Sequence, residues 1–182
     1  MIEAYKRWRH RRGFGIHSPF AYKVVKDVID QPCAFYGYQD IEEALEHTRR
    51  PAELRKFARL LLRLSAFLRP EKICMSRSAP DLLSLALRLG YSRAEVTGMH
   101  TPSSVAKGCT LFVDTDRTFG ADEIEKLTGL PHITLFLINA ADEVHKRIKE
   151  EPPAGVTFYS KRHILIFTRP DFPPVIYSMR LP

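Results

Sequence analysis

The strongest indication of fold class lies in the stretch HITLFLI, residues 132–138. Apolar side chains fill it almost without a break, and several are of the β-branched or aromatic types that favour strands. A strand with apolar side chains on both sides fits the interior of a parallel sheet, because helices cover both faces of such a sheet. The stretch therefore predicts a buried parallel strand over His132–Ile138. The segment Ala141–Glu150 behind it predicts a helix that Pro152 and Pro153 end.

Strand and helix patterns alternate on both sides of this stretch. Before it, strands are predicted over Lys72–Met75, Glu95–Thr97 and Thr110–Asp114, and helices over Pro80–Leu89, closed by Gly90 as C′ residue, and Ala121–Leu127. After it, Val156–Tyr159 and Ile164–Thr168 flank a polar turn and Val175–Leu181 alternates, which predicts an antiparallel end. The alternation predicts a three-layer α/β sandwich with a mostly parallel sheet and a carboxyl-terminal antiparallel hairpin.

The first third of the chain has helical patterns only. Ser18 and Pro19 predict the start of a helix that runs to about Asp30. Asp40 with Glu43 three residues later resembles a capping box for a short helix through Leu45. Apolar residues at helical spacing predict a longer helix over residues 53–68, ended by Pro70. We therefore expect a basic helical module at residues 1–69, packed on an α/β domain at residues 70–182.

Composition and charge limit the classes of protein. The chain has 182 residues and a net charge of +7, and residues 1–69 carry most of the excess, with 14 Lys and Arg against 8 Asp and Glu. The sequence contains no apolar run of the roughly 18 residues that a membrane-spanning helix needs, and no signal-peptide pattern. Cys33, Cys74 and Cys109 are an odd number and far apart, which favours free thiols. We expect a cytoplasmic protein with no membrane partner.

Both ends of the chain carry features of one family. Residues 13–20 read GFGIHSPF, an aromatic loop follows at Phe35–Tyr38, and a Leu-rich helix ends in Arg69 and Pro70. Residues 143–167 have the pattern of a helix followed by two strands with a turn between them, in the same order as the family's last helix and terminal hairpin. The chain resembles bacterial class I S-adenosylmethionine-dependent methyltransferases in which this amino-terminal module precedes a catalytic domain. The resemblance implies a Rossmann-like sandwich and, in intact members, S-adenosylmethionine as cofactor.

The middle of the chain departs from that family. The first strand of a methyltransferase ends in a glycine-rich turn that lets the backbone approach the cofactor, yet no glycine lies between Ser65 and Gly90. The second strand lacks the acidic residue that would bind the ribose. Only about a dozen residues then separate this strand from the next one, where the family has a helix, a third strand and a second helix. The sequence is interpreted as a shortened, degenerate member. It predicts no bound cofactor and a binding or scaffold role, with an active methyltransferase of atypical site as the alternative.

Three residues are candidates for catalysis. Asp114 and Asp116 follow a predicted strand, where a doubly wound sheet opens its crevice. Asp116-Arg117-Thr118 partly fits a haloacid dehalogenase-type nucleophile motif, and the plainer interpretation is an aspartate that caps the next turn. His17 is a possible base or substrate contact, or it fixes the glycine turn. Asn139 is the one obvious neutral neighbour for a metal at the aspartates, so no metal site is predicted.

Basic residues suggest a weaker alternative, association with nucleic acid. On the predicted helix 53–68, and in the segment before the glycine turn, the candidates for phosphate contacts are Arg55, Lys56, Arg59, Arg63, Arg7, Arg9, Arg11 and Arg12. Nearby glutamates would offset part of this charge. The remaining partners are another protein or a second copy of the chain, since a sheet shortened by deletion exposes surface that favours association.

Overall fold

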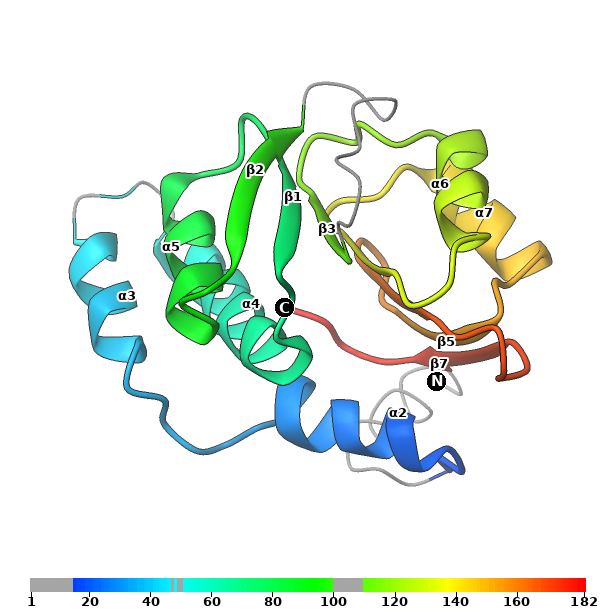
Figure 1. Cartoon of the computed structure of the whole chain (residues 1–182), viewed down its shortest axis with the longest axis horizontal. Coiled ribbons are helices and arrows are strands. Elements are labelled where there is room, and N and C mark those ends of the chain that lie inside the picture. Colours follow the sequence, from blue (N-terminus) through cyan, green and yellow to red (C-terminus); the bar gives the residue numbers. More distant parts are fainter. Residues whose placement is uncertain (1–14, 47, 49–50, 100–109) are drawn as a thin grey trace.

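We analysed a computed structural model, which describes residues 15–46, 48, 51–99 and 110–182. Its centre is a sheet of seven strands in the order β2-β1-β3-β4-β6-β5-β7 (Figure 1). The strands are β1 (Lys72–Ser76), β2 (Glu95–Met99), β3 (Leu111–Asp114), β4 (Thr134–Leu137), β5 (Gly155–Tyr159), β6 (Ile164–Thr168) and β7 (Val175–Ser178). The class is α/β, as the alternation of patterns predicts.

Only β6 runs against the other strands of this sheet. It is antiparallel to both β4 and β5, whereas β1, β2, β3 and β4 pair in parallel. The predicted hairpin of β5 and β6 is therefore confirmed. The final strand differs from the prediction, because β7 pairs parallel to β5. Both sides of β6 are already paired, and β7 joins the sheet on the free side of β5, where it runs in the direction of β5.

Helices cover both faces of the sheet and give three layers (Figure 1). One buried cluster joins one face to α2 (Pro19–Val24), the π-helical turn η1 (Val25–Ile29), α3 (Tyr38–Leu45), α4 (Pro51–Leu68) and α5 (Asp81–Gly90). A second cluster joins the other face to α6 (Ala121–Thr128) and α7 (Asp142–Glu150). The alternating side chains of β3 show the division, since Leu111 and Val113 belong to the first cluster and Phe112 to the second.

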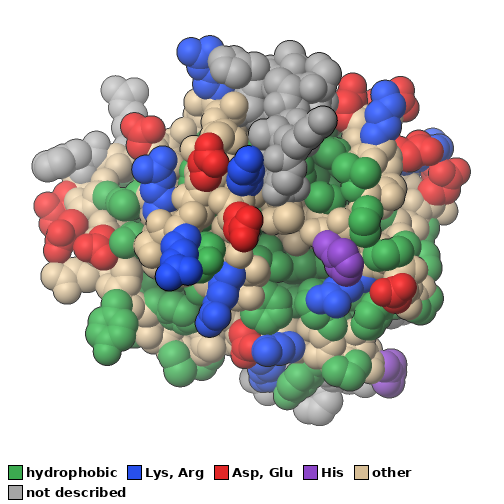
Figure 2. Space-filling view, in the orientation of Figure 1, with side chains coloured by type: hydrophobic (Ala, Val, Ile, Leu, Met, Phe, Trp, Pro, Cys, Tyr) green, Lys and Arg blue, Asp and Glu red, His purple; other side chains and the backbone are tan. Residues whose placement is uncertain are grey.

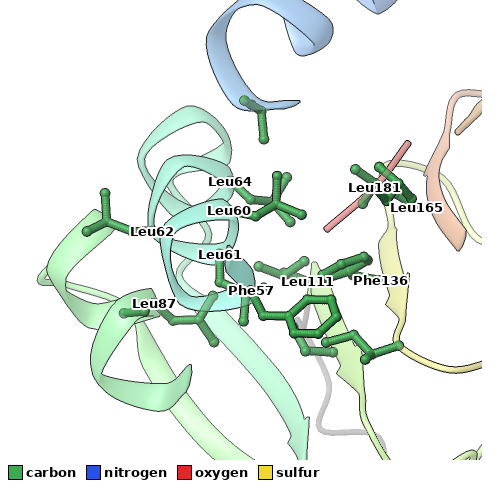
Figure 3. Packing of buried hydrophobic residues seen from close by; sticks show 14 of the residues in the cluster. Phe57, Leu60, Leu61, Leu62, Leu64, Leu87, Leu111, Phe136, Leu165 and Leu181 are labelled. Atoms are coloured by element: carbon green, nitrogen blue, oxygen red, sulfur yellow. The ribbon is translucent and has the colours of Figure 1, made fainter. Parts of the chain in front are cut away.

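The long helix α4 is the centre of the first cluster. It carries Leu60, Leu61 and Leu64, which are fully buried, and Leu60 and Leu64 lie on the side toward Leu165 and Leu181 (Figure 3). Phe57 on the same helix contacts the ring of Phe136 on β4, with ring centroids 6.4 Å apart. The apolar periodicity of residues 53–68 predicts this helix correctly, and the helix starts two residues earlier at Pro51.

Two local predictions need correction. Helix α3 begins at Tyr38 with Gly37 as its N-cap residue, so Asp40 is not a cap but part of the first turn. Gly90 is the last residue of α5 and has no left-handed backbone conformation. A Cβ at Gly90 would overlap the carbonyl oxygen of Leu62 on α4. Glycine is therefore needed there because two helices approach each other closely, and not because the chain turns.

The start of α2 agrees with its sequence signal. The Ser18 hydroxyl accepts a hydrogen bond from the backbone N–H of Ala21 at 3.3 Å, and Pro19 occupies the first turn. The helix passes into the π-helical turn and ends at Ile29, one residue before the predicted end. This segment packs on the sheet through Phe20, whose ring lies 5.4 Å from that of Phe167 on β6.

Candidate functional site at the carboxyl edge of the sheet

The order of the strands changes direction at β1. From β1 the chain goes first to β2 on one side and then to β3 on the other. In open α/β sheets, ligands bind at such a point, in the crevice outside the carboxyl ends of the strands. The last residues of the two strands that flank this point are Ser76 on β1 and Asp114 on β3. These two residues mark the candidate ligand-binding position in this sheet.

Asp114 is buried, with 3% of its surface exposed. Its carboxylate accepts four hydrogen bonds at 2.9–3.1 Å, from the Ser76 hydroxyl and from the backbone N–H groups of Asp116, Thr118 and Phe119. An ionised carboxylate offers about four lone-pair positions. The carboxylate that the sequence marks as a catalytic candidate is thus occupied by the loop that follows it, which is the turn-capping role.

The turn after β1 is also closed. The Ser76 hydroxyl accepts a hydrogen bond from the N–H of Thr115 at 3.0 Å, and the carbonyl of Ser76 accepts one from Ala79 at 3.1 Å. Ser76 is 2% exposed, and the side chain of Ala79 belongs to the first buried cluster. No residue from 76 to 80 has a positive φ, so this turn needs no glycine. The turn is therefore held by hydrogen bonds to Ser76 and by the packing of Ala79.

Asp116, the second candidate, is exposed and accepts a hydrogen bond from the Thr115 hydroxyl at 2.9 Å. The next residue, Arg117, has a φ of 57° and donates from Nε to the carbonyl oxygen of Asn139 at 2.7 Å. Asn139 also has a φ of 57°. Left-handed backbone is uncommon outside glycine and tolerated best by residues such as asparagine. Arg117 and Asn139 thus join the loops after β3 and β4.

His163 belongs to this edge although the sequence does not mark it as a site residue. It lies at the end of the turn between β5 and β6, and its Nδ1 accepts a hydrogen bond from the N–H of Asn139 at 3.1 Å. Its ring packs edge-on against Phe57 at 5.0 Å. Burial, assisted by the charge of Arg162, lowers the pKa of His163 to about 4. The ring is neutral at pH 7 with its proton on Nε2, and it fastens the β4 loop to the β5–β6 turn.

A small pocket of about 230 Å³ remains beside this network. It is lined by Glu53, Leu54 and Phe57 of α4, by Pro80 and Leu83 at the start of α5, and by Thr115, Ile138 and Asn139. Pockets that hold drug-sized ligands measure about 300–1,000 Å³. The carboxyl edge thus offers a shallow hollow with few polar groups.

The structure does not bring the three catalytic candidates together. His17 is exposed and precedes α2, whose Phe20 lies beside Thr110 and Thr134. These threonines stand at the amino ends of β3 and β4, whereas Asp114 ends β3 at the opposite edge. His17 and the aspartates therefore lie at opposite edges of the sheet and cannot form one constellation.

The basic residues of α4 are mostly bound within the chain. Arg55 and Arg59 both contact the carboxylate of Glu42 on α3, with ion pairs of 2.7 and 2.8 Å. The hydrogen bond from Arg55 is the main reason why the pKa of Glu42 is lowered. Arg63 donates to the carbonyl of Val28 and to the hydroxyl of Tyr38. Of the four, Lys56 is exposed without an ion pair to a described residue.

The remaining predicted contacts cannot be compared with the structure, because Arg7, Arg9, Arg11 and Arg12 lie outside the described residues. On the face drawn in Figure 2, acidic and basic side chains are intermixed. Within the described ranges, no group of three or more His, Cys, Asp or Glu side chains could hold a metal ion. None of the helices described there is both long and apolar enough to cross a membrane.

Comparison with models of known protein families, with curated proteins and with solved structures finds no match to this chain.

Proposed function

We propose that this chain is a methyltransferase-like protein that does not use S-adenosylmethionine and acts as a binding or scaffold protein in the cytoplasm. The family resemblance of both ends suggests the origin. A mostly parallel sheet whose strand order reverses between β1 and β3 is compatible with a shortened Rossmann-like sandwich. The observation that carries the proposal is the hydrogen bond between Ser76 and Asp114 at that switch, 2.9 Å long.

Two properties of the strand ends support the loss of the cofactor. The turn after β1 contains no glycine, and the side chain of Ala79 within it is buried in the first cluster. The sequence of β2, EVTGM, offers no carboxylate at its end for ribose hydroxyls. A ligand that displaced the loop after β3 would break the hydrogen bonds of Asp114, and each buried N–H left without its partner costs about 1–3 kcal/mol.

A binding role needs a surface, and the sheet has two edge strands, β2 and β7. Edge strands carry unpaired backbone groups that can pair with another chain. β7 covers only Val175–Ser178, with Pro173 and Pro174 before it. A short strand preceded by two prolines is poorly suited to pair with another chain. The edge strand β2 is therefore the better candidate for contact with a protein partner or a second copy.

The direct test is isothermal titration calorimetry of the full chain with S-adenosylmethionine and S-adenosylhomocysteine. We expect no saturable heat at micromolar ligand. Saturable binding of either compound overturns the proposal. Light scattering of the same sample over a concentration series then separates self-association from binding to another protein.

The alternative is an active methyltransferase with an atypical site. The pocket that holds Thr115 and Asn139 favours it, because both residues place polar atoms at the carboxyl edge. Methyl transfer depends chiefly on positioning donor and acceptor. The same titration with S-adenosylmethionine decides between the two functions. If the chain is an active methyltransferase, Thr115→Val should weaken the binding of the cofactor.

A further inference from the structure

The amino edge of the sheet, opposite the site described above, has a larger hollow of about 340 Å³. This volume lies within the range of about 300–1,000 Å³ that is usual for small-molecule sites. Phe20 of α2, Leu68 of α4 and Phe167 of β6 form apolar walls. The charged or titratable side chains of its lining are Arg69, Glu71, His132 and Arg169.

Arg169 is the best-placed of these groups. Its guanidinium carbon lies 4.2 Å from the ring centre of Phe20 and 5.8 Å from that of Phe172. Contact with aromatic faces holds a guanidinium flat and leaves the N–H donors at its rim free. Within the described part of the chain, no carboxylate forms an ion pair with Arg169. An arginine held in this way can donate charge-assisted hydrogen bonds to the carboxylate or phosphate of a ligand.

Arg69 and His132 line the same hollow from strained positions. Their φ angles are 49° and 59°, in the left-handed region where glycine or asparagine costs least. Arg69 follows the last residue of α4, at the position where helices most often have glycine. Both side chains are exposed. Such conformations cost of order 1–3 kcal/mol and cluster at ligand sites, and here both positions carry side chains that can bind an anion.

We propose that this hollow binds a small organic anion, a carboxylate or phosphate attached to an apolar body. Arg169 and Arg69 bind the anionic group, His132 adds a hydrogen bond, and Phe20 and Leu68 contact the apolar part. Glu71 is the one carboxylate among the described lining residues and leaves the lining with a net positive charge. The proposal does not depend on whether the carboxyl edge binds S-adenosylmethionine.

The test is an NMR titration of the full-length, ¹⁵N-labelled protein with phenyl phosphate, phenylacetate and inorganic phosphate. We expect saturable shifts for at least one organic probe, concentrated near residues 69, 132–134 and 167–169. A comparison of the affinities for phenyl phosphate and phenylacetate shows whether the hollow prefers a phosphate or a carboxylate. Weaker binding of inorganic phosphate is expected, because it lacks the apolar body.

Arg169→Gln and Arg69→Gln should each weaken binding about tenfold or more, the effect of one charge-assisted hydrogen bond. Lys161→Gln, at the opposite edge in the β5–β6 turn, removes the same charge and should change nothing. The side chain of Arg69 is exposed, so Arg69→Gln keeps the test valid if Arg169→Gln unfolds the protein. Shifts that stay linear to millimolar probe, or that Lys161→Gln reduces as much as the arginine variants do, overturn the proposal.

Discussion

Ser76 and Asp114 end neighbouring parallel strands, and the serine hydroxyl donates to the aspartate Oδ1 at 2.9 Å. The two residues stand 38 positions apart in the chain. Three backbone N–H groups of the loop behind β3 complete the shell of the carboxylate. The arrangement anchors the loop after β3 to the end of β1, so a substitution of Asp114 should lower the stability of the fold.

Asp114→Ala should destabilise the fold by about 3 kcal/mol or more, because it leaves several buried donors without an acceptor. For a protein of this length, that corresponds to a fall in Tm of about 6–12 °C. Urea unfolding followed by circular dichroism measures the change. Asp116→Ala is the matched control, since Asp116 is exposed, and should stay within about 0.5 kcal/mol of the parent. Equal effects of the two substitutions would contradict the anchoring role of Asp114.

Gly90→Ala should also destabilise the protein, although alanine favours helices by about 1 kcal/mol over glycine. The added methyl group would overlap the Leu62 carbonyl and lies 2.9 Å from Cβ of Ser65, so α5 would have to move away from α4. Overpacking of this kind costs about 1–3 kcal/mol. Gly98→Ala is the control, because a Cβ there meets no atom within 4 Å. Thermal unfolding of both variants should show a loss for Gly90→Ala alone.

The α/β class could be predicted from the sequence because a strand that is buried on both faces of the sheet has a continuous apolar stretch of sequence. The apolar stretch at 132–138 and the periodicity of residues 53–68 each report the surroundings of one element. Ser18 is a correct cap prediction for the same reason, since its hydrogen bond spans three residues. The local pattern fails where a residue is required by a contact between distant segments. Glycine is needed at position 90 because Leu62 of another helix lies so close.

The candidate site could be predicted only in part. The sequence predicts that a strand ends at Asp114, and the structure confirms this, because a polar residue after an apolar stretch is a local signal. Whether Asp114 faces a ligand or a serine depends on the pairing of β1 with β3, which no local pattern contains. His163 was missed because it lies in a polar turn, and only the fold brings it against Asn139 and Phe57.

Glu42→Gln should increase the affinity of the chain for nucleic acid if α4 binds phosphates at all. The substitution removes the carboxylate that both Arg55 and Arg59 contact, and so frees their charge. Fluorescence anisotropy with a labelled duplex over a series of salt concentrations measures this, since phosphate contacts steepen the salt dependence. Glu43→Gln, whose side chain instead accepts from Gln39, is the control of equal charge. No difference between the two variants would remove α4 from the nucleic-acid hypothesis.

His163 should make the protein less stable in mild acid. Its pKa in the fold is about 4, below the ordinary value of 6.5, so the unfolded chain binds the proton first. The stability contribution is complete above pH 6.5 and is lost as the pH falls from 6.5 toward 4. The loss between pH 7.5 and pH 5 should be about 2 kcal/mol, from 1.36 kcal/mol per pKa unit. His145, whose pKa burial also lowers, adds in the same direction.

Urea unfolding at pH 7.5 and pH 5 measures this loss directly. His163→Gln should lower stability at pH 7.5 and flatten the difference between the two pH values, because glutamine does not titrate. His132→Gln is the control, since His132 is exposed, and it should leave the difference unchanged. If His163→Gln keeps the full pH dependence, the ring is not held neutral by burial, and its bond to the Asn139 N–H cannot be what fastens the two loops.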